Sequence, residues 1–268
     1  MTILDEILAT KRDEVTVLRR PQTRDLLRRQ ALDAPPTRDF GGALVRADGR
    51  LAVIAECKRR SPSKGPLAPD LDPAETARSY AAGGAAAMSV LTDQVYFGGT
   101  VADLQAARAA VDIPILRKDF TIDEVQVHEA RAIGADAILL ILAAIPDDAH
   151  LLDLHDLATA LGLGVLVEAH DAAEVARAVA LGVGVVGVNA RDLATFGEDL
   201  DGAAAAAASI PAGTTAVAES AIRGVDDAAR MAAVGFDAVL VGEALVRAPD
   251  PTALVAAMTD VTVRRRGG

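Results

Sequence analysis

Lysine is rare in this chain, and two of its lysines stand where catalysis could use them. The 268 residues contain four lysines and twenty-three arginines. Lys58 ends the apolar run LAVIAECK, and Lys118 ends the run IPILRK. A buried or crowded lysine can lose and regain its proton near neutral pH, whereas arginine stays charged. The pattern indicates either two catalytic acid–base groups or a codon bias that left these lysines by chance.

The other two lysines carry weaker signals. Lys64 lies in the loop SPSKG, where closure over a substrate and an ordinary loop charge fit equally well. Lys11 lies in an N-terminal helical pattern, and we expect it to be a solvated surface charge.

Polar residues also end most of the other apolar runs. They are Glu56, Arg117, Asp119, Glu168, His170, Asn189, Arg191, Asp192, Glu219, Ser220, Gly242 and Glu243. Side chains alternate between two faces along a strand, so Glu56 and Lys58 point to one side and Cys57 to the other. Each charge alone could be a solvated loop residue or half of an ion pair between strands. Together they favour an acid–base site, with Arg117, Asp119 and Asp192 as structural groups at its rim.

The runs that carry these residues alternate with helical patterns. Eight short apolar runs cover 51–57, 86–91, 113–118, 136–142, 164–168, 184–189, 214–219 and 237–241. Asp-Pro pairs at Asp72 and Asp250 mark helix starts, and Asp171 with Glu174 matches a capping box. Eight such units predict an α/β fold, a closed (β/α)8 TIM barrel, with an open doubly wound sheet as the alternative.

The chain divides into three parts. Residues 1–50 carry helical patterns at 2–19 and 23–32, and we expect an N-terminal helical extension packed on the barrel. Residues 51–260 are expected to form the barrel, and residues 261–268 a disordered tail.

Composition excludes several classes of function. The net charge of −11 argues against nucleic acid and anionic membranes as partners. No stretch of about eighteen apolar residues is free of charge, so no membrane span is expected. The single cysteine, Cys57, excludes an internal disulfide and fits the cytoplasm. The histidines show no metal-ligand spacing, so we expect no metal, and no dinucleotide or Walker fingerprint occurs.

A barrel of parallel strands places its active site at the C-terminal strand ends. This rule brings Glu56, Lys58, Lys118 and Glu168 to one mouth. The segments 219–221 and 241–244, after the last two strands, carry small residues whose backbone N–H groups could bind a phosphate. The sequence therefore predicts an acid–base cluster beside a phosphate site.

Several long motifs, in this order, resemble one enzyme family. They are LDEILATKRDEV (4–15), IAECKRRSPSKG (54–65), SVLTDQVYFGG (89–99), ILRKDFTIDEVQVHEARAIGADAILLI (115–141), LVEAHD (166–171), VGVNARDLATF (186–196), AESAI (218–222) and GFDAVLVGEALVRAPDP (235–251). Over nearly its whole length the sequence resembles indole-3-glycerol phosphate synthase, the barrel lyase of tryptophan biosynthesis.

The resemblance implies a reaction and roles in it. The substrate would be 1-(2-carboxyphenylamino)-1-deoxyribulose 5-phosphate, whose ring closure releases CO₂ and water without a cofactor. Lys118 would be the general acid at ring closure, with Glu168 stabilising charge beside it, while Glu56 and Lys58 would serve the dehydration. Such a cluster supplies the acids and the base that these steps need near neutral pH. Which lysine protonates at which step stays open.

The resemblance also implies how the substrate is bound. Asn189 and Arg191 would position it, with Arg191 against the aromatic carboxylate. The phosphate would contact Ser61, Ser220, Ala221, Gly242 and Glu243, and the anthranilate ring would contact Phe97, Phe120, Leu140 and Leu193. The family usually has glycine where Ala221 stands. If that position needs a positive φ, the methyl group costs free energy, and phosphate would still bind, more weakly.

Two other functions compete with this one. An isomerase on the same barrel, such as phosphoribosylanthranilate isomerase, would use cysteine and aspartate at strand ends, but Cys57 points away from the predicted site. A non-catalytic phosphate-ligand barrel would be favoured by loss of a mouth lysine or glutamate, and all four are present. We expect a cytoplasmic monomer with a sugar-phosphate substrate and at most loose association with other enzymes of the tryptophan pathway.

Overall fold

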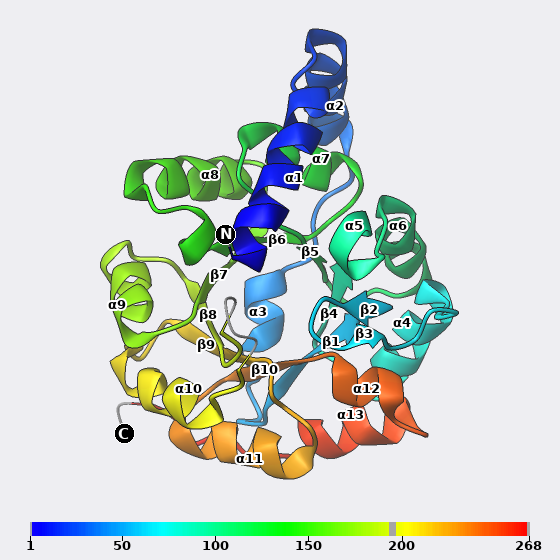
Figure 1. The fold of residues 1–268 in the computed structure, drawn as a ribbon. Helices are drawn as coiled ribbons and strands as arrows, with labels where there is room; N and C mark the ends of the chain where they lie inside the picture. The colour runs from blue at the N-terminus through cyan, green and yellow to red at the C-terminus, as the bar shows by residue number, and fades with distance from the viewer. Residues whose placement is uncertain (1, 193–196, 267–268) are drawn as a thin grey trace.

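A closed barrel of parallel strands forms the centre of the computed structural model, which describes residues 2–192 and 197–266 (Figure 1). The barrel strands are β1 (Ala52–Cys57), β4 (Ala87–Leu91), β5 (Ile115–Lys118), β6 (Ala137–Ile141), β7 (Gly164–Ala169), β8 (Val185–Asn189), β9 (Thr215–Glu219) and β10 (Ala238–Val241). They pair in that order, and β10 closes on β1 through pairs such as Ala52 with Ala238. All eight predicted runs form strands, and the closed barrel is confirmed over the open sheet.

Helices surround the barrel and connect successive strands. They are α4 (Pro73–Ala82), α5 (Gln94–Phe97), α6 (Val101–Ala110), α7 (Glu124–Ala132), α8 (Asp148–Ala160), α9 (Ala172–Ala180), α10 (Leu200–Ala206), α11 (Val225–Val234), α12 (Glu243–Arg247) and α13 (Pro251–Thr259). Short 3-10 turns, η1 (Leu142–Ala144) and η2 (Ala207–Ser209), and a small hairpin, β2 (Arg60–Ser61) with β3 (Gly65–Pro66), lie in the connections.

The predicted caps start their helices, with one difference. Asp72 accepts hydrogen bonds from two backbone N–H groups of the first turn of α4, and Asp250 accepts one at the start of α13. Asp171 likewise accepts from the N–H of Glu174 in α9. Glu174 does not complete the predicted capping box, because its carboxylate accepts from the backbone N–H of His170 instead.

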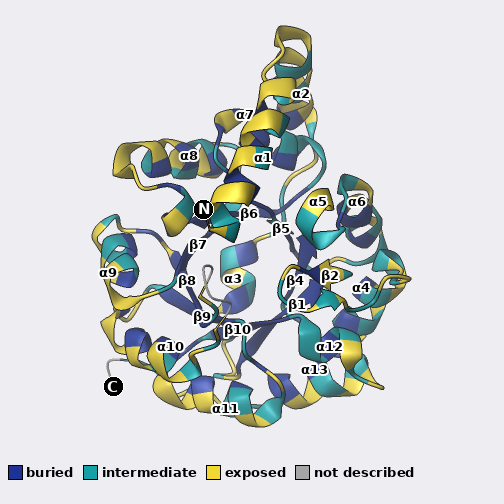
Figure 2. Ribbon diagram, in the orientation of Figure 1, coloured by how far each residue is buried: buried dark blue, intermediate teal, exposed yellow. Residues whose placement is uncertain are grey.

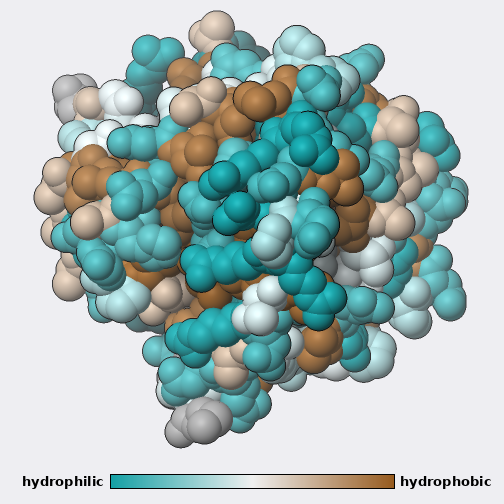
Figure 3. Space-filling model, turned by 90° about the horizontal axis from the view of Figure 1, so that it is seen from above, coloured by the Kyte–Doolittle hydropathy of each residue, from teal (hydrophilic) through white to brown (hydrophobic). Residues whose placement is uncertain are grey.

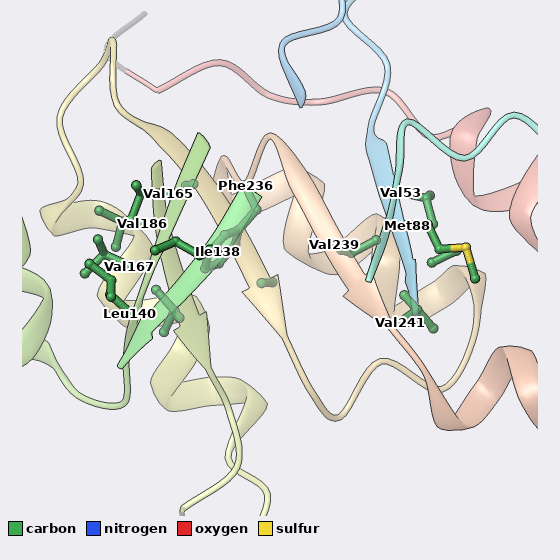
Figure 4. Packing of buried hydrophobic residues seen from close by; sticks show 14 of the residues in the cluster. Val53, Met88, Ile138, Leu140, Val165, Val167, Val186, Phe236, Val239 and Val241 are labelled. Atoms are coloured by element: carbon green, nitrogen blue, oxygen red, sulfur yellow. The ribbon is translucent and has the colours of Figure 1, made fainter. Parts of the chain in front are cut away.

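The apolar core has two layers because strand side chains alternate between the barrel interior and the surrounding helices. Outward side chains such as Val53, Leu140 and Val239 pack against the helices (Figure 4). Inward side chains pack around the barrel axis, and the strands are almost entirely buried (Figure 2).

Three N-terminal helices precede the barrel and close both of its ends. Helix α3 (Phe40–Leu44) lies at the N-terminal strand ends, where Phe40 packs against Gly164, the first residue of β7. Helices α1 (Ile3–Leu18) and α2 (Pro21–Asp33) form a hairpin that projects from the barrel, with α2 against α7 (Figure 1). The opposite end of α1 packs over the barrel mouth, where Ile7 and Leu8 are buried in the inner cluster.

The last described residues contact the base of the barrel. Thr262 forms a β-bridge with Arg50, and the guanidinium of Arg266 donates to Oδ2 of Asp237 at 2.8 Å. Residues 267 and 268 lie outside the described residues.

The surface at the α1–α2 end is largely hydrophilic, with apolar patches between the polar side chains (Figure 3). Among the described residues, no helix combines the length and the apolar character needed to cross a bilayer.

Candidate active site

A cavity of about 540 Å³ lies at the C-terminal ends of the barrel strands. Most of the predicted site residues line it: Glu56, Lys58, Ser61, Phe97, Lys118, Phe120, Glu168, Asn189, Arg191, Ser220, Ala221, Gly242 and Glu243. The barrel geometry thus brings together residues that are up to 187 positions apart, because each lies at the end of a strand or after it, and all strands end at the same rim.

Lys118 is held at the centre of this rim by carboxylates. Its Nζ lies 2.9 Å from Oε2 of Glu168 and 3.5 Å from Oε2 of Glu219. Burial alone would lower the pKa of Lys118, but the negative charge of the neighbouring Glu168 outweighs it and raises that pKa. The ammonium is therefore the resting form at neutral pH, which is the form that can donate a proton.

Glu168 has a full set of partners. Besides Lys118, the amide of Asn189 donates to its Oε1 at 3.1 Å, and Nε2 of His170 lies 3.3 Å from the same oxygen. Burial would raise the pKa of Glu168, but the charge of Lys118 and the contact with His170 hold it well below its usual range. This carboxylate stays ionised.

Glu219 was expected among the polar residues that end strands at this rim, but no catalytic role was assigned to it. Its side chain is 2% exposed, and neither carboxylate oxygen has a hydrogen-bond partner among the described residues. Burial, followed by the negative charge of Glu168, raises the pKa of Glu219 to about 8, against the opposing effect of Lys118. Space for this side chain comes from Gly187 on β8, where a Cβ would collide with Oε1 of Glu219.

Glu56 and Lys58 form a second ion pair on the opposite side of the mouth. Nζ of Lys58 lies 2.7 Å from Oε1 of Glu56, and both side chains line the cavity as the alternation along β1 predicted. Gly242, at the end of β10, leaves the room that they occupy, since a Cβ there would meet Oε1 of Glu56 and, at 3.1 Å, Nζ of Lys58. The glycine therefore shapes the pocket around the pair.

Cys57, between these two residues, points the other way. It is buried in the outer cluster between the barrel and the helices. Burial raises the pKa of its thiol to about 12, so the thiol stays protonated and unreactive at neutral pH.

Arg191 links two loops at the entrance. Its Nη1 donates to Oγ of Ser63 at 2.5 Å, and its Nη2 donates to Oε1 of Glu198 at 2.6 Å. The loop that carries Ser61 and Lys64 is thereby fastened to the end of β8. Glu198 also lines the cavity and was not predicted.

The apolar wall differs from the prediction at one position. The rings of Phe97 and Phe120 lie with centroids 6.2 Å apart and line the cavity together with Leu139 and Ile141. Leu140 was predicted here, but it is fully buried on the outer face of β6 (Figure 4). The prediction chose the wrong face of this strand.

The remaining predicted wall residue, Leu193, lies outside the described residues. Helix α1 contributes three wall residues that were not predicted, Ile3, Leu4 and Ile7.

The loop after β9 turns through two left-handed residues. Ser220 has φ 64° and Ala221 has φ 58°. The position of Ala221 therefore needs the positive φ that glycine adopts freely, and the methyl group carries a conformational cost of about 1–2 kcal/mol. Both residues face the cavity at the predicted phosphate site.

Lys11 is not the solvated surface charge that we expected. It is 1% exposed, and its Nζ lies 2.9 Å from Oδ1 of Asp119, 3.0 Å from Oδ2 of Asp93 and 2.8 Å from Oε2 of Glu14. Burial would lower the pKa of Lys11, but Asp119 and Asp93 raise it. Because Asp119 follows Lys118 directly, this ion-pair cluster ties α1 to the rim of the active site.

Comparison with known proteins decides the family. The model of the family "Indole-3-glycerol phosphate synthase" matches residues 4–258. A protein of that name from a Nocardioides species is 54% identical over 97% of this chain and 99% of its own length. Another from Laribacter hongkongensis is 51% identical over 95% and 97% of the two chains. The chain belongs to the indole-3-glycerol phosphate synthase family.

Membership in this family confirms the resemblance seen in the motifs, and with it a carboxy-lyase of tryptophan biosynthesis. More distant solved structures share the barrel alone. A 3-hexulose-6-phosphate synthase superimposes with a TM-score of 0.61 at 22% identity over 78% of this chain and 98% of its own. A thiamine phosphate pyrophosphorylase from Pyrococcus furiosus superimposes with a TM-score of 0.58 at 18% identity over 80% and 96%.

Proposed function

We propose that this indole-3-glycerol phosphate synthase closes the indole ring of 1-(2-carboxyphenylamino)-1-deoxyribulose 5-phosphate with Lys118 as the general acid. The observation that carries this proposal is the buried ammonium of Lys118, held by Glu168 in a cavity that has an apolar wall on one side. The aromatic carbon that bears the carboxylate attacks the substrate carbonyl, and Lys118 gives a proton to the carbonyl oxygen. CO₂ then leaves, and the electrons of the broken C–C bond restore the aromatic ring.

Dehydration needs a second acid and a base. The acid gives a proton to the leaving hydroxyl, and the base takes one from the ring carbon next to nitrogen. Glu56 and Lys58 are an ion pair at the mouth that can contact the hydroxyls and serve this step. Glu219 retains its proton below a pH of about 8, so it can return a proton to Lys118 after ring closure.

Glu168 acts without giving up its charge. Its carboxylate stabilises the ammonium of Lys118 before the transfer and the cationic ring intermediate after it. Asn189 fixes the orientation of Glu168 through a hydrogen bond of 3.1 Å. In a buried site such fixed charges stabilise a developing charge more strongly than water does.

Substrate binding divides between three parts of the cavity. The anthranilate ring packs against Phe97 and Phe120, and its carboxylate pairs with Arg191 until it leaves as CO₂. The phosphate is bound by Ser61 and by the backbone after β9 and β10, at Ser220, Ala221, Gly242 and Glu243. With the substrate bound in this way, we expect its carbonyl between Lys118 and Lys58.

The enzyme works on a small sugar phosphate, and we place it in the cytoplasm as a monomer. The single buried cysteine suits a reducing compartment. Any association with other enzymes of the tryptophan pathway is expected to be loose.

An assay of indole fluorescence with this substrate tests the proposal. The parent enzyme should produce indole-3-glycerol phosphate, and Lys118→Met should reduce kcat by about 10²–10⁴-fold, the contribution of one general acid. The matched control is Arg12→Met on the exposed face of α1, which should leave kcat unchanged. A folded parent protein without activity would overturn the reaction, and a Lys118→Met variant with near-parental kcat would overturn the role of Lys118.

A further inference from the structure

His170 lies directly behind the catalytic rim. It follows β7, and the alternation along the strand sends its side chain to the same side as Glu168, two residues earlier. Its Nε2 lies 3.3 Å from Oε1 of Glu168, within ion-pair distance but without the alignment of a hydrogen bond. The ring is 14% exposed and is not part of the cavity lining, so it does not face the substrate.

A second carboxylate holds the other side of the ring. Oε2 of Glu174 lies 3.2 Å from Nδ1 of His170 and accepts the backbone N–H of His170 at 2.8 Å. This is the glutamate that the sequence predicted for a capping box. A neutral imidazole has one N–H donor and one acceptor nitrogen, whereas the imidazolium presents N–H groups on both sides. Carboxylates at both nitrogens therefore select the imidazolium.

The charged groups around Glu168 come from four elements. Lys118 on β5 and His170 after β7 are cations beside it, and Asn189 on β8 donates a neutral hydrogen bond. Glu219 on β9 is an acid that shares Lys118 with it. Glu56 on β1 adds a more distant negative charge at the mouth, which acts on Lys118 and Glu219.

Two neighbouring carboxylates of like charge cannot both ionise easily, so one of them keeps a proton. Of this pair, only Glu168 has a second cation among the described residues, His170, which lies beside Oε1 while Lys118 lies beside Oε2. We propose that His170 is a positioning residue that keeps Glu168 ionised and aimed at Lys118, and so leaves the proton of the carboxylate pair on Glu219. The inference rests on the proposed role of Glu168 and identifies the residue that keeps Glu168 in the state this role needs.

The electrostatics agree with this geometry. Burial alone would lower the pKa of His170, but its contacts with Glu168 and Glu174 raise it to about 10. The pKa of Glu168 is held low while that of Glu219 is raised to about 8. If the cation is removed, the pKa of Glu168 must rise. Because activity needs ionised Glu168, the acidic limb of the kcat–pH profile should then move to higher pH.

Two nearly isosteric substitutions of His170 separate the effect of its positive charge from that of a neutral N–H group facing Glu168. In His170→Gln the amide nitrogen takes the place of Nε2 and still faces Glu168, but without charge. In His170→Asn the amide reaches only toward Glu174. His155→Asn on α8, where the ring lies beside the exposed Asp156, is the matched control and should match the parent.

We expect kcat to fall about tenfold in His170→Asn, by analogy with the loss of groups that orient a catalytic ligand. Its acidic limb should move up by about one pH unit, and KM should change less than twofold. His170→Gln should lie between this variant and the parent. His170→Arg, which restores a positive charge at the same place, should return the limb toward the parental position. If His170→Asn does not fold, the limb should still lie at higher pH in His170→Gln than in the parent, and close to the parental position in His170→Arg.

The inference would be overturned if the acidic limb of the kcat–pH profile lay at the parental pH in both His170→Asn and His170→Gln. Glu168→Gln separates that failure from a failure of the proposed function. If Glu168→Gln is inactive and the His170 variants keep the parental acidic limb, the proposed role of Glu168 stands and that of His170 is wrong. An active Glu168→Gln removes the role of Glu168, and with it the inference.

Discussion

Replacing Lys11 by methionine should destabilise the enzyme far more than a substitution on a surface helix normally does. Methionine preserves the length and the apolar stem of the side chain but removes the charge. Asp93 is 0% exposed, and its Oδ2 makes no hydrogen bond among the described residues, so its ion pair with Lys11 at 3.0 Å is what compensates the buried charge. Asp119 is affected less, because Arg117 lies 3.2 Å away and Thr92 donates to it at 2.6 Å.

The size of the destabilisation depends on which aspartate loses its only compensating charge. Removing one member of a buried ion pair costs about 3–5 kcal/mol, mainly because the other charge stays buried. Most of that cost should fall on Asp93. In the double variant Lys11→Met with Asp93→Asn, the amide oxygen can still cap α5 by accepting from Tyr96 and Phe97, as Oδ1 of Asp93 does. The double variant should therefore regain about 1–3 kcal/mol of stability relative to Lys11→Met, the cost of one unsatisfied buried group.

Urea unfolding at pH 7, followed by far-UV circular dichroism, measures these differences. The control is Arg12→Met, the same change at the next position of α1, which is exposed and should stay within about 0.5 kcal/mol of the parent. Because α1 supplies Ile3, Leu4 and Ile7 to the cavity wall, Lys11→Met should also raise KM. If Lys11→Met were as stable as Arg12→Met, or if the double variant were less stable than the single one, the reasoning would be refuted.

Three further changes test other parts of the site. Ala221→Gly removes the strain of φ 58° and should stabilise the protein by up to about 1 kcal/mol in urea unfolding, with a lower KM if the methyl group also hinders phosphate binding. Gly187→Ala should push Glu219 out of place and reduce kcat/KM by about 10²-fold, whereas Gly184→Ala, which meets no atom within 4 Å, should not. Glu219 has a folded-state pKa of about 8, above the value of about 4.3 in an unfolded chain, so the folded state holds the extra proton between these values and loses stability as pH rises. The free energy of unfolding of Glu219→Gln, relative to that of the parent, should therefore increase from pH 5 to 8 by at most about 1.4 kcal/mol per pH unit. A difference between the two proteins that did not change with pH would contradict the raised pKa.

The barrel could be predicted because its strands and helix starts are signalled locally. Each strand is a short apolar run, and aspartates such as Asp72 and Asp250 cap the following helices as their position before proline predicts. The mouth residues followed from the same signals, since polar groups at the ends of parallel strands must meet at one rim. Family motifs then supplied roles that spacing alone left open.

The face of β6 could not be predicted because the strand is apolar on both sides. The run AILLI contains no polar residue that would mark an inner face, as is usual for parallel strands buried on both sides. Register decides the matter. Ile141 pairs with Glu168, whose side chain points into the mouth, so Ile141 and Leu139 point inward and Leu140 outward. Sequence reasoning had no access to that register.

The partners of Lys11 were hidden for a different reason. Asp93 and Asp119 lie 82 and 108 residues away, and only the packing of α1 over the barrel brings them together. A lysine on an amphipathic helix looks like a surface charge until its tertiary contacts are known. Glu174 illustrates the same limit at short range, because a capping box and a clamp on His170 have the same sequence pattern.

Charge pairing at the mouth explains why lysine was retained there in an arginine-rich chain. Lys118 faces two carboxylates, and one of these, Glu168, has His170 as a further cation while the other, Glu219, has no hydrogen bond among the described residues. This asymmetry sets one ionised and one protonated carboxyl on either side of a single ammonium. In the proposed mechanism, a proton that Lys118 gives to the substrate is replaced from Glu219, while Glu168 keeps the lysine in place. An arginine at position 118 would satisfy both carboxylates, but its guanidinium is a weaker acid than an ammonium and gives up a proton less readily. The proposed mechanism therefore depends on the lysine itself, and on the two glutamates being held in different protonation states.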